Sequence, residues 1–250
     1  MKFFDSHAHL TSTEVLPDLN AVLERAKEAG VDRIVNICTC KQTLEDGIRL
    51  GLINAGATTP HDVEKEGEVN FPIFEKAARE GSLVAIGETG LDYHYAHSDR
   101  SVQKKFLVRY LHLAAELGLP VIFHCREAFE DLFSIVDLEY PKGAKAILHC
   151  FTGSETEAEE VFKRGWHLSL SGIVTFKKSE SLRRVARWAP VEQLLIETDT
   201  PYLAPQSKRG RPNEPAFVVE TAACIAETKG VSLAAVADQT WRNGNTLFRL

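Results

Sequence analysis

Short apolar runs alternate with longer amphipathic stretches along most of the chain. The apolar runs lie at residues 3–6, 33–37, 55–58, 83–87, 120–123, 146–148, 167–170 and 193–196. Several are rich in Val, Ile and Leu and show little polar alternation, which is typical of strands buried on both faces. The run at 55–58 gives the weakest strand signal because it is short and not strongly apolar.

Segments with helical periodicity lie between these runs. Residues 19–29 place four apolar side chains on one face, and the pattern stops at Gly30. Similar stripes lie at residues 102–117, 155–163 and 214–228, with shorter ones at 131–138 and 181–188. We therefore expect helices to connect the predicted strands.

Eight strands that alternate with helices predict an α/β protein with a parallel sheet. Eight such units favour a closed TIM-type (β/α)₈ barrel over an open doubly wound sheet. No Gly-rich phosphate loop of the Rossmann or P-loop kind follows the first predicted strand. A length of 250 residues suits one barrel, so we expect residues 1–250 to form a single domain.

Composition and charge narrow the classes of function. The chain is 44% hydrophobic and 26% charged, with a net charge of −6, so a general nucleic-acid coat is excluded and phosphate binding needs a local basic site. The sequence has no signal-peptide pattern, no membrane-length apolar run and an odd number of cysteines, five. We expect a cytoplasmic protein with reduced thiols, no membrane contact and no obligate protein partner.

Residues with metal-binding side chains stand where five of the predicted strands end. The carboxyl ends of barrel strands carry the loops in which active sites form. The residues are His7 and His9 after the first strand, Glu88 after the fourth, His124 after the fifth, His149 after the sixth and Asp199 after the eighth. Four imidazoles and two carboxylates suit two borderline divalent ions, and a carboxylate can bridge such a pair.

Two cysteines directly follow predicted ligands. Cys125 comes after His124, and Cys150 comes after His149. Because neighbouring residues of a strand point to opposite faces, we expect both thiols to face the helical layer as small buried groups.

Several motifs along the chain together resemble, in order, the signatures of the TatD family. They are DSHAHL at 5–10, IGETGLDY at 86–93, HCREA at 124–128, HCFTGS at 149–154, ETDTPYL at 197–203, RGRPNEP at 209–215 and NTLF at 245–248. That family is similar to the amidohydrolase superfamily of metal-dependent hydrolases on TIM-type barrels. Its characterised members are described as deoxyribonucleases, some of them 3′ exonucleases.

The resemblance implies that the six residues at the strand ends bind two divalent ions (Zn, Mn or Mg), with Glu88 as the bridge. It implies an ester-bond hydrolase, most simply a deoxyribonuclease of the 3′ exonuclease type that uses metal-activated water on DNA or another phosphodiester. The chain departs from the family at residues 57–62, where Thr59 replaces the first histidine of the usual Gly-Ile-His-Pro-His-Asp and His61 keeps the second.

Roles follow for individual residues. Asp199 is the candidate general base, because a carboxylate at a metal can take the proton of the attacking water. His61, Arg126 and Arg209 are the candidate substrate contacts. For Arg126 the alternative is a surface ion pair with Glu127 or Glu130, and for the basic loop around Arg209 it is ordinary solvation.

The sequence leaves the bond that is cut open. An amide or ester hydrolase, such as an aminoacyl-tRNA deacylase, would use the same two-metal scaffold. A non-catalytic metal-binding module is a third alternative, which loss of a ligand would have favoured, and no ligand is lost.

Overall fold

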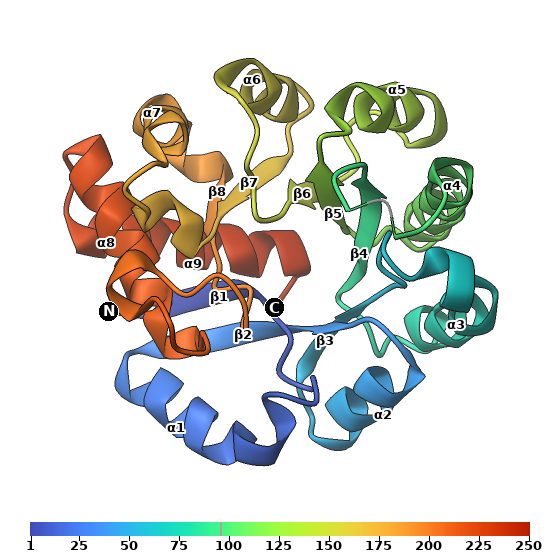
Figure 1. Ribbon diagram of the computed structural model, residues 1–250, viewed down its shortest axis with the longest axis horizontal. Coiled ribbons are helices and arrows are strands. Elements are labelled where there is room, and N and C mark those ends of the chain that lie inside the picture. Colours follow the sequence, from blue (N-terminus) through green and yellow to red (C-terminus); the bar gives the residue numbers. More distant parts are fainter. Residues whose placement is uncertain (96) are drawn as a thin grey trace.

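In the computed structural model, which describes residues 1–95 and 97–250, parallel strands form a barrel surrounded by helices (Figure 1). Each strand pairs with the next along the chain. The strands are β1 (Phe3–Ala8), β2 (Val31–Cys38), β3 (Ile53–Gly56), β4 (Ala85–Asp92), β5 (Val121–Arg126), β6 (Ala146–Leu148), β7 (His167–Leu170) and β8 (Leu194–Ile196). The predicted TIM-type (β/α)₈ barrel is confirmed.

The barrel closes just beyond the end of β8. The backbone N–H of Asp199 donates to the carbonyl of His7 over 2.9 Å, and that of His9 donates to the carbonyl of Thr200 over 2.8 Å. Ala8 and Thr200 form an isolated parallel bridge. Closure of the barrel therefore brings the segment after β8 alongside the histidines of β1.

The helices cover the outside and one end of the barrel. They are α1 (Leu19–Glu28), α2 (Lys41–Arg49), α3 (Val63–Arg79), α4 (Arg100–Leu117), α5 (Phe129–Glu139), α6 (Glu155–Lys163), α7 (Glu180–Trp188), α8 (Val218–Lys229) and α9 (Leu233–Phe248). Short 3₁₀ turns lie at Leu16–Asp18, Gly172–Thr175, Val191–Gln193, Gln206–Lys208 and Pro215–Phe217.

The six predicted helical segments are all present, but α2, α3 and α9 were not predicted. Gly47 lies within α2, and Gly67 and Pro72 lie within α3, where these residues weaken the helical signal. The segment predicted at 214–228 starts later than expected, because Pro215 begins a 3₁₀ turn and α8 itself begins at Val218.

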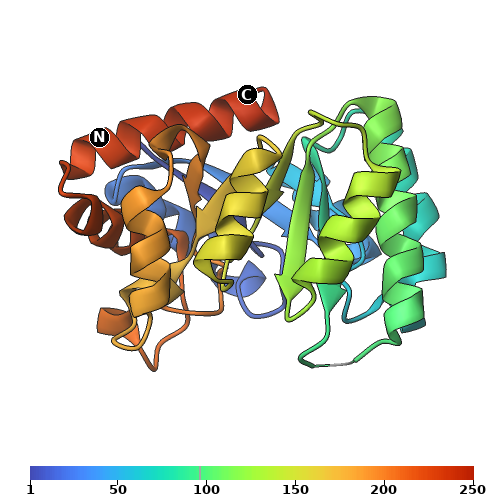
Figure 2. The same ribbon diagram turned by 90° about the horizontal axis from the view of Figure 1, so that it is seen from above.

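The interior of the barrel is closed at its amino end. Apolar side chains from most of the strands, including Phe4 and Ile122, form one cluster with Leu247 and Phe248 of α9. The rings of Phe4 and Phe248 stack at 5.9 Å. Figure 2 shows α9 lying across the end of the barrel opposite to the strand arrowheads. The carboxyl ends of the strands therefore remain the open end of the barrel.

The two cysteines that follow predicted ligands lie in different environments. Cys125 packs in the apolar layer between strands and helices, as expected. The expectation for Cys150 is wrong: its φ is +44°, so strand alternation has ended, and it is not part of that apolar layer. The Cys150 thiol lies 3.2 Å from the Ser171 hydroxyl, and burial raises its pKa well above the usual value.

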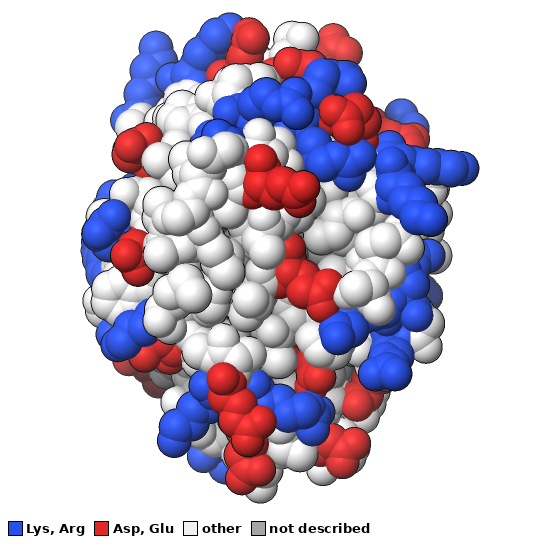
Figure 3. All heavy atoms as spheres, turned by 90° about the vertical axis from the view of Figure 1, so that its left-hand side faces the viewer, with Lys and Arg blue, Asp and Glu red and all other residues white. Residues whose placement is uncertain are grey.

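Basic and acidic side chains are interspersed on the face shown in Figure 3, around a broad uncharged area. Across residues 1–95 and 97–250, no helix combines the length and the apolar character needed to cross a bilayer.

We predict that Gly67→Ala destabilises the protein, although Ala usually stabilises a helix. A Cβ at Gly67 would lie 2.5 Å from the Phe106 ring of α4, and such overpacking costs about 1–3 kcal/mol. Denaturant unfolding measures the effect. Val69→Ala, at a 68% exposed position of the same helix, is the matched control and should change stability by less than about 0.5 kcal/mol. Unchanged or higher stability in Gly67→Ala would contradict the close packing of α3 on α4.

Candidate metal centre

A cavity of about 510 Å³ opens at the carboxyl end of the barrel. Five of the six residues predicted as metal ligands line it, namely His9, Glu88, His124, His149 and Asp199. The sixth, His7, has no exposed surface and lies beside Glu88. All six predicted residues therefore meet in one place.

Glu88 lies within β4, and not after the end of the strand as predicted, because β4 extends to Asp92. Glycines on either side let this strand approach β5 closely. A Cβ at Gly87 would lie 2.6 Å from the backbone oxygen of Ile122, and one at Gly90 would collide with the carbonyl of His124. Both glycines have φ near +150°, where other residues are strained. This local backbone brings the Glu88 side chain to the histidines.

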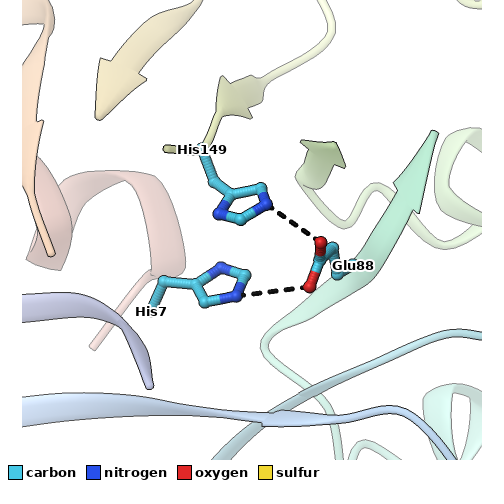
Figure 4. A group of neighbouring side chains, drawn as sticks. All are labelled: His7, Glu88 and His149. Atoms are coloured by element: carbon cyan, nitrogen blue, oxygen red, sulfur yellow. Dashed lines mark hydrogen bonds and ion pairs between the residues drawn. The ribbon is translucent and has the colours of Figure 1, made fainter. Parts of the chain in front are cut away.

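The two oxygens of Glu88 face two different pairs of imidazoles. Oε1 lies 2.7 Å from His124 Nδ1 and 3.0 Å from His149 Nε2. Oε2 lies 3.4 Å from His7 Nε2 and 3.7 Å from His9 Nε2. Figure 4 shows the carboxylate pointing between His7 and His149. One buried carboxylate is thus shared by two groups of ligands.

Asp199 completes the group around β1. Its Oδ1 lies 3.6 Å from His7 Nε2 and 3.5 Å from His9 Nε2. We call His7, His9, Asp199 and Glu88 Oε2 half-site A. We call His124, His149 and Glu88 Oε1 half-site B.

The donor set fits divalent cations. The ligand atoms of His7, His9 and Asp199 lie within 4.8 Å of one another, as do those of His7, Glu88 and His149. Imidazole nitrogens and carboxylate oxygens are the usual ligands of zinc and of other borderline divalent ions. Each half-site offers at least three such atoms, so both suit a cation.

Burial and neighbouring groups set the protonation of the central residues. Burial, aided by nearby His149, lowers the pKa of His7 to about 4. Burial alone would raise the pKa of Glu88, but the imidazoles of His149, His124 and His7 hold it well below its usual value. Around neutral pH, His7 is therefore neutral and Glu88 is ionised, which are the states that bind a metal.

Two buried carboxylates at the site were not predicted from the sequence. Asp92 Oδ2 accepts a hydrogen bond from His124 Nε2 over 2.9 Å. Glu197 Oε1 lies 3.3 Å from His149 Nδ1. Both residues lie in motifs quoted above, and Asp92 stands four residues after Glu88 in the same strand, so strand alternation was the signal that pointed to it.

Of the predicted substrate contacts, His61 and Arg126 line the cavity. His61 Nε2 lies 3.6 Å from Asp92 Oδ2. The Arg126 guanidinium lies 5.5 Å from the centre of the Tyr95 ring. Within residues 1–95 and 97–250, Arg126 has no carboxylate partner within 4.0 Å, so the alternative of an ion pair with Glu127 or Glu130 is not what the structure contains.

Arg209 lies outside the cavity lining, with its guanidinium 4.7 Å from the centre of the Phe176 ring. Lys208, in the same loop, lies 3.7 Å from Glu220. A role for Arg209 in substrate binding stays a prediction. Thr59, which replaces the family's usual histidine, lines the cavity and donates its hydroxyl to Asp62 over 3.0 Å.

Comparisons with known proteins identify the family and the fold. The model of the TatD related DNase family matches residues 4–249. The uncharacterized metal-dependent hydrolase YabD of Bacillus subtilis is 37% identical over 99% of both chains. The 3′-5′ ssDNA/RNA exonuclease TatD of Erwinia tasmaniensis is 36% identical over 99% of this chain and 100% of the relative. The crystal structure of YJJV, a TatD homologue from Escherichia coli, superposes with a TM-score of 0.93 at 27% identity, covering 99% of this chain and 98% of the other.

We predict that divalent ions stabilise the folded protein through this site. A ligand at 100 times its Kd adds about 2.7 kcal/mol, which for a chain of this size raises the melting temperature by about 5–10 °C. Calorimetry of chelator-stripped protein, with and without Zn²⁺ or Mn²⁺, measures the shift.

Glu88→Gln should lose most of this shift, because both half-sites lose their shared anion. Glu130→Gln removes an exposed carboxylate outside the cavity and should keep the shift. Equal shifts in the two variants would exclude Glu88 as a ligand.

Proposed function

Because this chain belongs to the TatD related DNase family and is a metal-dependent hydrolase of ester bonds, we propose that it is a deoxyribonuclease of the 3′ exonuclease type. The observation that carries the proposal is the division of Glu88 between two pairs of imidazoles at the base of an open cavity. The substrate is a DNA strand or another phosphodiester.

Five free cysteines fit a reducing compartment, so we also propose that the chain acts in the cytoplasm, as one domain.

The six residues of half-sites A and B would hold two divalent cations, Zn²⁺, Mn²⁺ or Mg²⁺, with Glu88 shared between them. Bound there, the cations would polarise a phosphoryl oxygen and lower the pKa of water. The remaining chemistry belongs to the side chains around the cavity.

Asp199 suits the role of general base. Its carboxylate lines the cavity and its side chain is 13% exposed, so it can meet an incoming water. Glu88 is more deeply buried and each of its oxygens faces two imidazoles. Asp199 therefore takes the proton as the water attacks phosphorus and the P–O bond to the departing nucleoside oxygen breaks, and the carboxyl can return that proton to the departing oxygen, while Glu88 stays a fixed anion.

Arg126 and His61 suit the phosphate. Arg126 is a half-buried cation whose charge no carboxylate among the described residues neutralises. A planar guanidinium binds two phosphate oxygens at once, which fixes the orientation of the scissile group. His61 lies on the same side of the cavity, beside Tyr95.

The size of the cavity supports action at a chain end. About 510 Å³ lies within the usual range for pockets that enclose one small ligand, which fits a terminal nucleotide better than a duplex. The Erwinia tasmaniensis relative, named as a 3′-5′ ssDNA/RNA exonuclease, supports the same class of substrate.

We predict that the protein shortens 5′-labelled single-stranded DNA from its 3′ end when Zn²⁺, Mn²⁺ or Mg²⁺ is returned after chelation. An aminoacyl-tRNA and a simple phosphodiester are tested in parallel. His7→Ala and Glu88→Ala should each lose about 10³-fold or more in kcat, because metal activation contributes several kcal/mol. Circular dichroism checks that both variants fold.

If only the aminoacyl-tRNA is cleaved, the proposed nuclease activity is wrong and the alternative, a deacylase on the same scaffold, takes its place. Full activity in His7→Ala or Glu88→Ala would exclude the metal mechanism.

We predict that Arg126→Ala raises KM for DNA by about 10–100-fold, because a charge-assisted hydrogen bond to substrate is worth about 1.5–3 kcal/mol. Arg126→Lys keeps the charge but lacks the planar guanidinium, so its KM should lie between those of the native protein and Arg126→Ala. Steady-state kinetics separate KM from kcat. Arg242→Ala, in α9 outside the cavity lining, is the control. An unchanged KM in Arg126→Ala would remove Arg126 from the substrate site.

A further inference from the structure

The two histidines of half-site B present opposite ring nitrogens to Glu88. His124 turns its Nδ1 to Glu88 Oε1, whereas His149 turns its Nε2 to the same oxygen. Each imidazole has one further nitrogen, and in both cases a carboxylate faces it. Asp92 Oδ2 lies 2.9 Å from His124 Nε2, and Glu197 Oε1 lies 3.3 Å from His149 Nδ1.

This arrangement is not repeated at every histidine of the centre. The Nδ1 atoms of His7 and His149 are both buried without a hydrogen-bond partner in the part of the chain that the structure describes, but only that of His149 has a carboxylate at ion-pair distance, because His7 approaches Glu88 and Asp199 through Nε2. The outer carboxylates therefore belong to half-site B and are not a general feature of the barrel rim.

Both outer carboxylates are buried at a cost in free energy. Asp92 is 1% exposed and Glu197 has no exposed surface. One oxygen of Glu197 accepts from the backbone N–H of Cys150, but Oε2 has no hydrogen-bond partner among residues 1–95 and 97–250. A buried acceptor left unpaired costs about 1–3 kcal/mol, so this side chain does not serve stability.

The backbone fixes which oxygen of Asp92 faces His124. Oδ1 accepts the N–H groups of His94 and Tyr95 over 3.0 and 2.8 Å. Oδ2 is therefore the atom left to accept from His124 Nε2.

We propose that Asp92 and Glu197 are the positioning residues of half-site B. Asp92 accepts the Nε2 proton of His124, and Glu197 places a carboxylate oxygen 3.3 Å from His149 Nδ1, where it favours a proton on that nitrogen; both leave a lone pair on the nitrogen that faces Glu88. The inference rests on the proposed metal-binding function and adds two residues that act through the ligands. Such partners of ligating histidines typically change metal affinity 10–100-fold.

His61, Asp92 and His124 also bring ligand atoms together, but this group does not suit a separate cation. A neutral imidazole has one lone pair, and in half-site B that of His124 is on Nδ1. A cation beside Asp92 would need a second lone pair on Nε2 of the same ring. Asp92 instead accepts the proton on Nε2 of His124, so it can orient the ring while the lone pair stays on Nδ1.

Two isosteric variants distinguish tautomer control from a merely structural role. In Asp92→Asn, the N–H groups of His94 and Tyr95 hold the amide oxygen in place of Oδ1, so the NH₂ group faces His124 Nε2. The proton of His124 then moves to Nδ1, and the lone pair that faces Glu88 is lost.

Glu197→Gln, unlike Asp92→Asn, should leave the tautomer of the ligating histidine unchanged. The oxygen that accepts from Cys150 N–H is the same atom that faces His149 Nδ1, so the amide oxygen keeps the native tautomer. Glu197→Leu removes the acceptor altogether. Glu192→Gln, which removes an exposed charge just before β8, is the matched control.

The experiment titrates chelator-stripped protein with Zn²⁺ against a competing chromophoric chelator and fits the two binding events. We expect Asp92→Asn and Glu197→Leu to weaken one event by 10–100-fold. Glu197→Gln and Glu192→Gln should stay close to the native affinity. In the Zn²⁺-loaded native protein, ¹⁵N shifts should show His124 protonated at Nε2 and His149 protonated at Nδ1.

Equal affinities in the native protein, Asp92→Asn and Glu197→Leu would overturn the positioning role, even if the native protein digests DNA. The expected order of affinities in a protein that cleaves no phosphodiester would support the positioning role and overturn the proposed activity. If Asp92→Asn does not fold, as judged by circular dichroism, the comparison of Glu197→Leu with Glu197→Gln decides.

Discussion

The carboxylate of Glu88 is the interaction on which the rest of the centre depends. It is a buried anion, and burying a charge is costly unless partners surround it. Four imidazoles from three strands supply those partners, two at each oxygen. The close approach of β4 to β5, which Gly87 and Gly90 permit, is therefore part of the site and not only of the fold.

Different contacts stabilise the two ends of the barrel. At the amino end, α9 covers the interior, and Phe248 stacks on Phe4. At the carboxyl end, the last strand joins the first through backbone hydrogen bonds of Asp199 and His9. The first end is apolar and filled, so polar groups and an open cavity can gather only at the second. This separation of stability from chemistry is the general pattern of TIM barrels.

Most of the strands, helices and site residues could be predicted from the sequence, and the exceptions have physical causes. Strands buried on both faces give continuous apolar runs, so all eight were found, including the weak one at β3. Helices α2 and α3 carry Gly and Pro within them and were not found. Cys150 was expected in the helical layer, but strand alternation ends at its positive φ and its thiol lies beside Ser171, which no local sequence pattern predicts. Arg209 follows β8 as expected and its side chain lies against Phe176, so its role in substrate binding stays a prediction.

The sequence by itself determined the class of fold, the set of six candidate metal ligands and the resemblance to one family. These depend on local periodicity and on residue type, which a chain displays directly. Only the tertiary structure decided which oxygen of Glu88 faces which imidazoles, and that Asp92 and Glu197 face the remaining nitrogens. Those contacts join strands far apart in the chain, and they depend on differences of an ångström or less, which sequence spacing does not encode.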